Sequence, residues 1–256
     1  MNKKVAIHFM SFYFTDVIFM VVDRLHEVTK HPFRIIVGDN LSENSPIIRE
    51  KLRDYVEQGK ISTAYFFDNN SRYNRMEMYK NEPKPDYYIG SDQDALVEDN
   101  QDGCWLTDFV EMLESDNNVG ITGFSAKNGW GSRSGQKRPF HQTSGQKWKM
   151  YPPKKRNGHG LPFNGHLMTY KTEFMDEFRK TGKMYSDGNI QRFIANLGYA
   201  SARYDKSSVY NVSSIKRGFS VDGMDIAVEH GYKKLRASFR HVRRKSGNFE
   251  IIRSDG

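Results

Sequence analysis

The feature that most constrains the fold is a regular alternation of strand and helix patterns over the first 126 residues. Apolar, β-branched segments that read as buried strands alternate with segments whose apolar residues recur at helical spacing. Alternation of this kind is typical of an α/β protein with a parallel sheet and helices on both faces. The expected strands cover residues 5–12, 33–40, 61–70, 86–92 and 119–125, and the expected helices cover residues 15–30, 42–60, 71–82 and 104–115.

The regular pattern stops after Ala126. Residues 127–160 are rich in Gly, Ser, Lys, Arg, Pro and Gln, and we expect them to form a basic loop. Regularity returns with a strand and helix in residues 162–182 and a further helix in residues 186–199. We expect one domain over residues 1–256, made of a first half (1–126), the basic loop (127–160) and a second half (161–256).

Polar residues follow three of the expected strands, at the point where each strand ends. In an open α/β sheet, ligands bind at the carboxyl ends of the strands, so we expect these side chains to line one crevice. Turn preferences alone would account for any single one of them. The residues concerned are Asp39 and Asn40, then Asp68, Asn69 and Asn70, and finally Asp92 and Asp94.

Charge divides the chain into an acidic and a basic part. Residues 1–116 contain 13 Lys and Arg against 21 Asp and Glu, whereas residues 117–256 contain 26 against 10. Charge this uneven along a chain indicates two surfaces with different partners. The basic residues that we expect to bind nucleic acid are Arg133, Lys137, Arg138, Lys147, Lys149, Lys154, Lys155 and Arg156.

The N-terminal segment imitates a secretory signal, because two lysines precede an apolar run. Polar residues interrupt that run, and no small-residue cleavage site follows it. No other segment approaches the roughly 20 apolar residues of a membrane span. Cys104 is the single cysteine, so the chain has no internal disulfide. We expect a cytoplasmic protein (in the host cytoplasm if it is viral) without an integral membrane segment.

Three segments carry a resemblance to a known family: "IIVGDNLSEN", "FFDNNSRYNRMEMYKN" and "DYYIGSDQDALVED". They resemble the nucleotide-sugar-binding half of GT-A fold glycosyltransferases, and most closely the large inverting family that includes cellulose-synthase-like and bacterial polysaccharide enzymes. "GDNLSEN" is similar to the family's pyrimidine-contacting turn, from which Glu43 departs, and "SDQD" to its Asp-x-Asp motif. The resemblance covers residues 3–126 well and 160–205 loosely. It implies a Rossmann-like, mixed but mainly parallel sheet flanked by helices, with a long basic insert.

The resemblance also implies a chemistry and a cofactor. A divalent cation, Mn²⁺ or Mg²⁺, would offset the charge on the diphosphate that leaves a nucleoside-diphosphate sugar, with UDP the expected nucleotide. Asp94 would ligate the metal, and Asp92 would contact the ribose or sugar and also the metal. The remaining residues expected to bind the nucleotide sugar are Asp39, Asn40, Asp68 and Arg75. Arg75 could add positive charge near the phosphates, and the alternative is that it is an exposed helix residue.

Inverting transfer needs a base that accepts the proton of the acceptor hydroxyl. By resemblance this base is Asp187, in "YSDGNIQRFIANLGY", where Ser186 and Asp187 replace the family's acid pair. The alternative is that Asp187 only caps a helix. Some family members add a metal-ligating histidine, and the matching place here holds Asn211. His166 and His230 remain possible ligands, but a histidine without a place in a motif is usually a packing or surface residue, so neither is included in the site.

In this family the second half of the domain faces the acceptor, and in this chain that half is basic. Lys and Arg neutralise phosphates, aromatic residues can stack on exposed bases, and a hydroxyl on a nucleobase is reached by flipping that base out. The favoured acceptor is a hydroxymethylated pyrimidine in bacteriophage duplex DNA. Two alternatives remain: a transferase acting on a cell-surface or lipid-linked glycan, and a non-catalytic nucleic-acid-binding protein on a transferase scaffold.

Overall fold

The computed structural model describes residues 3–11, 17–41, 45–99, 103–126, 146–153, 166–211, 219–221, 224–226 and 246–254. The helices are α1 (Val17–Val28), α2 (Ser45–Glu57), α3 (Asn74–Asn81), α4 (Trp105–Ser115), α5 (Thr172–Lys180) and α6 (Asp187–Asn196). The strands are β1 (Val5–Ser11), β2 (Arg34–Asp39), β3 (Thr63–Phe67), β4 (Tyr87–Asp92), β5 (Ala95–Val97), β6 (Val119–Ala126), β7 (Trp148–Tyr151), β8 (Met168–Lys171), β9 (Ala200–Asn211), β10 (Phe219–Val221), β11 (Met224–Ile226) and β12 (Phe249–Arg253). None of these helices has the length and apolarity needed to cross a bilayer.

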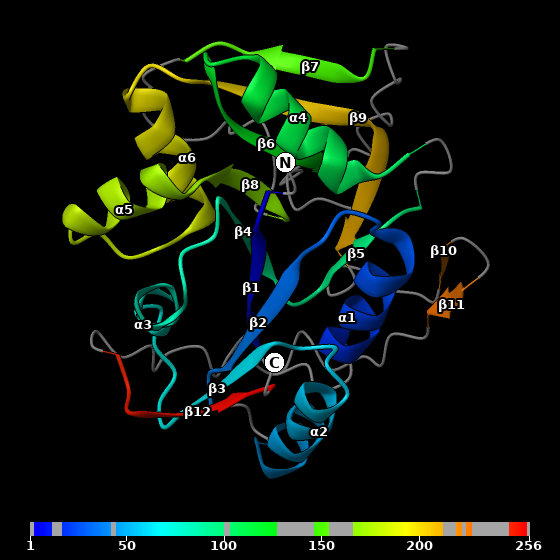
Figure 1. The fold of residues 1–256 in the computed structure, drawn as a ribbon, viewed down its shortest axis with the longest axis vertical. Coiled ribbons are helices and arrows are strands. Elements are labelled where there is room, and N and C mark those ends of the chain that lie inside the picture. Colours follow the sequence, from blue (N-terminus) through cyan, green and yellow to red (C-terminus); the bar gives the residue numbers. More distant parts are fainter. Residues whose placement is uncertain are drawn as a thin grey trace, which may run out of the picture.

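Ten strands form one sheet in the order β12-β3-β2-β1-β4-β8-β6-β9-β5, with β7 paired to β9 (Figure 1). Strands β3, β2, β1 and β4 are parallel, and β6 and β9 run the same way because β4 and β6 are both antiparallel to β8. Strands β5, β7, β8 and β12 run in the opposite direction. The mixed, mainly parallel sheet expected from the sequence is therefore confirmed.

Helices cover both faces of the sheet and create two apolar cores (Figure 1). The first core contains side chains of α1, α2 and α4, among them Leu25, Leu52 and Trp105. The second core contains side chains of α3, α5 and α6, among them Tyr79 and Phe178. Burial on both faces explains why the central strands read as continuous apolar runs in the sequence.

The elements expected in the first 126 residues are confirmed to within a few residues, and so are the helices expected around residues 172–182 and 186–199. The local patterns do not predict β5, β7, β9, β10, β11 or β12. β7 lies within the segment interpreted as a basic loop, and it pairs with β9, about 50 residues away in the sequence. Apart from residues 146–153, the segment 127–160 lies outside the described residues.

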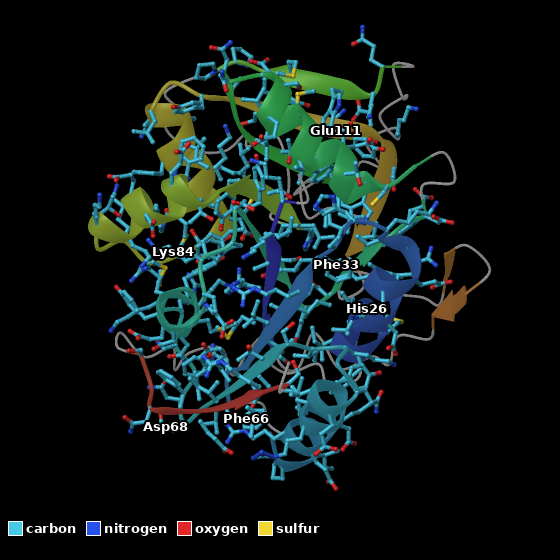
Figure 2. All side chains as sticks on the ribbon, viewed as in Figure 1. His26, Phe33, Phe66, Asp68, Lys84 and Glu111 are labelled. Carbon is cyan, nitrogen blue, oxygen red and sulfur yellow. The ribbon has the colours of Figure 1, made fainter. Side chains whose placement is uncertain are left out.

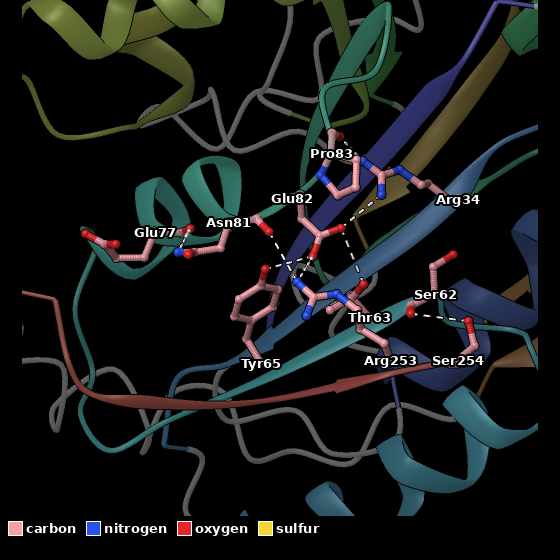
Figure 3. Close-up of polar contacts among 10 residues, drawn as sticks. All are labelled: Arg34, Ser62, Thr63, Tyr65, Glu77, Asn81, Glu82, Pro83, Arg253 and Ser254. Atoms are coloured by element: carbon pink, nitrogen blue, oxygen red, sulfur yellow. Dashed lines mark hydrogen bonds and ion pairs between the residues drawn. The ribbon is translucent and has the colours of Figure 1, made fainter. Parts of the chain in front are cut away.

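A buried acid at the amino ends of β2 and β3 holds the last strand of the sheet in place. The Glu82 carboxylate accepts hydrogen bonds from Arg34 Nη1 at 2.9 Å, Tyr65 Oη at 2.7 Å and Thr63 Oγ1 at 3.4 Å (Figure 3). Arg253 of β12 lies 3.5 Å from the same carboxylate. Two guanidinium groups and two hydroxyls therefore offset the cost of burying one carboxylate.

Replacing Glu82 by Ala should lower the free energy of unfolding by about 3 kcal/mol, because it removes the counter-charge of Arg34 and leaves the buried Tyr65 hydroxyl without its acceptor. Urea unfolding followed by circular dichroism measures the loss. An Arg53→Ala variant is the control, since it breaks the exposed 3.1 Å pair between Arg53 and Glu250 and should cost less than about 1 kcal/mol. Equal losses in the two variants would contradict this account of the sheet edge.

His8 lies fully buried in the middle of β1. Its ring stacks on Tyr79 with centroids 4.4 Å apart and meets Tyr88 edge-on at 5.3 Å. Within the described part of the chain, neither ring nitrogen of His8 has a hydrogen-bond partner. Burial, together with the positive charges of Arg34 and Arg75, holds the pKa of His8 well below its ordinary value of 6.5. The folded protein therefore keeps this imidazole neutral.

The low pKa of His8 predicts a loss of stability in acid. The unfolded chain protonates His8 near pH 6.5 and the folded chain does not, so the contribution is fully present above pH 6.5 and is lost as the pH falls below it. The loss is about 1.4 kcal/mol per pH unit. A His8→Phe variant should lose about 2 kcal/mol less than wild type between pH 7 and pH 5 in urea unfolding. A His26→Phe variant, changed on the exposed face of α1, controls for the substitution, and identical losses in wild type and His8→Phe would refute the prediction.

Candidate active site

A histidine joins the two aspartates that follow the buried strand β4. Asp92 ends β4, and Asp94 is buried in the turn that leads to β5. His166 is also buried and lies two residues before β8, whose register with β4 pairs Met168 with Gly90. Extended by two residues, that register places His166 opposite Asp92. One ligand atom from each of the three side chains lies within 4.8 Å of the others.

The backbone beside His166 is strained. Leu167 has a φ of 51°, in the left-handed region, which costs a residue with a side chain of this size about 1–2 kcal/mol. Its amide donates to Ser91 Oγ at 3.3 Å, which ties the residue after His166 to β4. Among the described residues, the only other non-glycine with a positive φ is Leu41, which follows Asn40 at the end of β2. Strain of this kind gathers where a side chain must be held in one position for function.

Two carboxylates and an imidazole are a suitable set of ligands for a divalent transition metal. Carboxylate oxygens suit Mg²⁺ and Mn²⁺ alike, whereas an imidazole nitrogen favours the transition metal. The structure thus brings His166 to the aspartate pair, although the sequence analysis set it aside in favour of the place that holds Asn211. Asn211 ends β9 and pairs with Ala95, and its side chain lies outside the described ones. The sequence signal for His166 is weak: a ligand-type residue ahead of a short apolar strand.

The negative charges of the aspartate pair affect the pKa of Asp187. Burial is the main cause that raises its pKa to about 8, followed by the negative charge of Asp92 and, less strongly, that of Asp94. Asp187 is the first residue of α6, and the N-cap is Ser186, whose Oγ accepts a hydrogen bond from the Asn189 amide at 3.2 Å. Capping therefore falls to Ser186, and the alternative role considered for Asp187 is already filled.

Arg75 links these groups. From the sequence it could be a phosphate contact or an exposed helix residue, whereas in the structure it is buried, with 6% exposure. Its Nη2 donates to the Ser91 carbonyl of β4 at 2.6 Å, and its guanidinium lies 4.9 Å from the centroid of the Tyr185 ring. The guanidinium also interacts electrostatically with Asp92 and Asp187. One positive charge is thus held beside the two carboxylates.

The polar end of β2 lies at the same edge of the sheet, separated from β4 by β1. β1 pairs Ser11 with Asp39 on one side and Met10 with Asp92 on the other. The Asp39 carboxylate is buried and accepts a 2.8 Å hydrogen bond from Arg49. Asn40 follows it and donates to Asn70 at 2.9 Å and to the Ser71 carbonyl at 3.2 Å. The ends of β2 and β3 are therefore joined by a network of polar side chains.

Asp68 lies at the outer margin of this edge, beside β12 (Figure 2). Its carboxylate accepts a 3.0 Å hydrogen bond from the side chain of Asn248, and its amide donates to the Asn248 carbonyl at 3.0 Å. In the strand order, β2 and β1 separate β3 from β4. Asp68 thus holds the chain segment before β12 and stands apart from the cluster of Asp92, Asp94 and His166.

Two of the eight basic residues predicted to bind nucleic acid lie in the described part of the chain. Lys147 makes a 2.7 Å ion pair with Asp108 of α4, and Lys149 of β7 lies 5.7 Å from the centroid of the Tyr151 ring. β7 pairs with the first half of β9, whereas the far end of β9 pairs with β5, next to Asp94. Neither lysine therefore borders the aspartate pair. The six others lie outside the described residues: Arg133, Lys137, Arg138, Lys154, Lys155 and Arg156.

Solved structures of glycosyltransferases share this fold. The mannosyltransferase PcManGT from Pyrobaculum calidifontis, in complex with GDP-Man and Mn²⁺, is 15% identical over 92% of this chain, with a TM-score of 0.57. GalNAc-T7 with UDP, GalNAc and Mn²⁺ is 17% identical over 87% of the chain, with a TM-score of 0.58. S. aureus TarS 1-349 is 12% identical over 82%, with a TM-score of 0.53. No family model matches the sequence, and no curated protein matches it.

These likenesses concern the fold. They confirm the GT-A architecture that the sequence resemblance implies. The chain spans 60%, 45% and 60% of the lengths of PcManGT, GalNAc-T7 and the TarS structure, respectively. What the chain does must therefore be argued from its own site.

Proposed function

We propose that the protein is a metal-dependent glycosyltransferase that moves a sugar from a nucleoside-diphosphate sugar to a hydroxyl acceptor. The observation that carries the proposal is the cluster of Asp92, Asp94 and His166 beside Asp187, at the carboxyl edge of a GT-A sheet. The similarity in fold to glycosyltransferases, two of them solved with Mn²⁺ and a nucleotide or nucleotide sugar, supports the same reading.

The donor side is assigned to residues of the first half and to His166. Asp92, Asp94 and His166 hold the cation, which when bound offsets the negative charge that develops on the departing diphosphate. Because one ligand is an imidazole, we expect Mn²⁺ rather than Mg²⁺. Asp39 with its Arg49 partner and Asn40 flank the nucleoside. Asp92 also contacts the ribose or sugar. Asp68 supports this edge of the sheet through its hydrogen bond with Asn248.

Asp187 is assigned as the general base. It accepts the proton of the acceptor hydroxyl while that oxygen attacks the anomeric carbon, and inversion follows if the attack is direct. A carboxyl with a raised pKa is well matched to proton transfer near neutral pH. Arg75 supplies a positive charge that interacts with both Asp187 and Asp92 and so offsets part of the repulsion between these two carboxylates.

The choice of nucleotide and of acceptor rests on the sequence. UDP is the first nucleotide to test, because of the "GDNLSEN" resemblance, and GDP is the second. The first acceptor is hydroxymethylated duplex DNA, because residues 117–256 carry 26 basic against 10 acidic residues. Lys147 forms an ion pair with Asp108, so we do not assign it to the contact with DNA.

The experiment is a screen of UDP- and GDP-sugars with Mn²⁺, read as release of the nucleoside diphosphate. Each donor is tested alone, with hydroxymethylcytosine-containing duplex DNA, and with lipid-linked or cell-surface glycans. The proposal expects metal-dependent release that one donor and one acceptor class stimulate. Binding of DNA without release from any donor would favour the non-catalytic alternative, and stimulation by a glycan alone would replace the DNA acceptor.

A further inference from the structure

The loop that leads into α6 lies close to β4 through the side chain of Tyr185. Tyr185 is buried, and its hydroxyl lies against Gly90 of β4. A Cβ atom at position 90 would lie 2.8 Å from Cζ of Tyr185 and closer still to its hydroxyl oxygen. Carbon atoms pack favourably at about 3.5–4.0 Å, so a side chain at position 90 would force Tyr185 to move by roughly 1 Å. This contact therefore requires glycine at position 90.

Two further buried tyrosines hold the hydroxyl of Tyr185. Tyr170 of β8 donates to it at 3.3 Å, and the hydroxyls of Tyr170 and Tyr79 lie 3.2 Å apart. The three side chains come from the loop, β8 and α3, and all are buried. Because a buried hydroxyl that loses its partner costs free energy, this chain of hydroxyls favours one position of Tyr185.

Arg75 ties Tyr185 to β4 a second time. Its guanidinium lies 4.9 Å from the centroid of the Tyr185 ring, and the same group donates to the Ser91 carbonyl of β4 at 2.6 Å. Tyr185 is therefore attached to β4 at Gly90 by direct contact and at Ser91 through Arg75.

We propose that Gly90 and Tyr185 are positioning residues that set the distance between the base, Asp187, and the metal ligands on β4. Asp187 follows Tyr185 by two residues and Asp92 follows Gly90 by two, so one contact fixes both chains next to the groups that must cooperate. The proposal rests on the proposed function, because it gives Asp187 the role of the base. A displacement of about 1 Å at such a site costs about 10²-fold in rate.

A double-substitution cycle tests the contact between Gly90 and Tyr185, using the donor that the screen identifies. Gly90→Ala should lower kcat for nucleotide release by about 10²-fold, with KM for the donor and the Mn²⁺ affinity within about threefold of wild type. Tyr185→Phe removes the hydroxyl oxygen, which is the atom nearest to the new methyl group, and leaves only the smaller overlap with Cζ. Added to Gly90→Ala, it should restore at least about tenfold of the lost kcat, because the two changes act on one contact.

Gly120→Ala is the control for steric crowding of the sheet by a new methyl group. A Cβ there would lie 2.5 Å from Ile194 and 2.6 Å from Tyr199, so it also crowds a strand of this sheet, but Tyr185→Phe should not rescue it. Hydrogen exchange of the amides of residues 184–190 gives a readout that does not need activity: exchange should quicken in Gly90→Ala and slow again in the double variant. If wild type turns over no donor, the proposed function fails. Hydrogen exchange still tests whether the contact between Gly90 and Tyr185 holds the loop in place. Gly90→Ala with wild-type kcat or wild-type exchange overturns the inference.

Discussion

Asp94→Asn is expected to lower metal-dependent release of the nucleoside diphosphate by about 10³-fold or more, since it removes a buried charged ligand from the site proposed to bind the cation. Asp92→Asn should lower release by a similar factor. His166→Ala should weaken Mn²⁺ binding and reduce the ratio of the affinity for Mn²⁺ to that for Mg²⁺. Release at saturating donor and isothermal titration with each metal measure these effects.

The control for the aspartate changes lies at the other end of the same strand. Asp86 is exposed just before β4 and accepts a hydrogen bond from the Lys4 amide at 2.7 Å. Asp86→Asn should leave both release and Mn²⁺ binding unchanged. If Asp94→Asn and Asp86→Asn behave alike, the cation is not held where the structure gathers its ligands.

Asp187→Asn is expected to lower the rate of transfer by about 10²–10⁴-fold, the usual contribution of a general base, with Mn²⁺ and nucleotide affinities retained. In wild type the rate should rise with pH, because only the ionised carboxylate accepts a proton. Without metal, burial and the charge of Asp92 raise the pKa of Asp187 to about 8. A cation held by Asp92 and Asp94 reduces that repulsion, so the midpoint of the rise should lie below about 8 and the rise should vanish in Asp187→Asn.

Ser186→Ala separates catalysis from helix capping. Ser186 caps α6 through the Asn189 amide, so its loss should cost about 1 kcal/mol of stability and leave the pH–rate profile in place. Asp187→Asn should do the reverse, with little change in stability. A pH profile that survives in Asp187→Asn would assign the base to another residue.

Much of the fold and half of the site follow from local patterns in the sequence. The polar ends of β2 and β4 are predictable because an apolar run that stops at Asp39 or at Asp92 marks the edge of a sheet, and parallel strands bring those ends together. Asp187 is named through the resemblance of "YSDGNIQRFIANLGY" to the family's acid pair, and its role as the base stays a prediction. The polar strand ends are predictable because the pattern that marks them lies within a few residues of them in the sequence.

The parts that were not predictable depend on partners distant in the sequence. His166 reaches Asp92 only because β8 inserts antiparallel between β4 and β6, about 75 residues after β4. Arg75 looks like a solvated helix residue until the loop carrying Tyr185 covers it. β12 is five residues long, and its place is set by the contact of Arg253 with Glu82 and by the hydrogen bond of the neighbouring Asn248 with Asp68. No local pattern in the sequence encodes these contacts.

The most direct test of the account is anomalous diffraction at the manganese edge from a crystal grown with Mn²⁺ and UDP. The account predicts one strong peak bound by Asp94 and His166, next to Asp92 and in contact with the diphosphate of UDP. A manganese ion bound elsewhere on the chain, or UDP bound with these three side chains making no contact to metal, would contradict it.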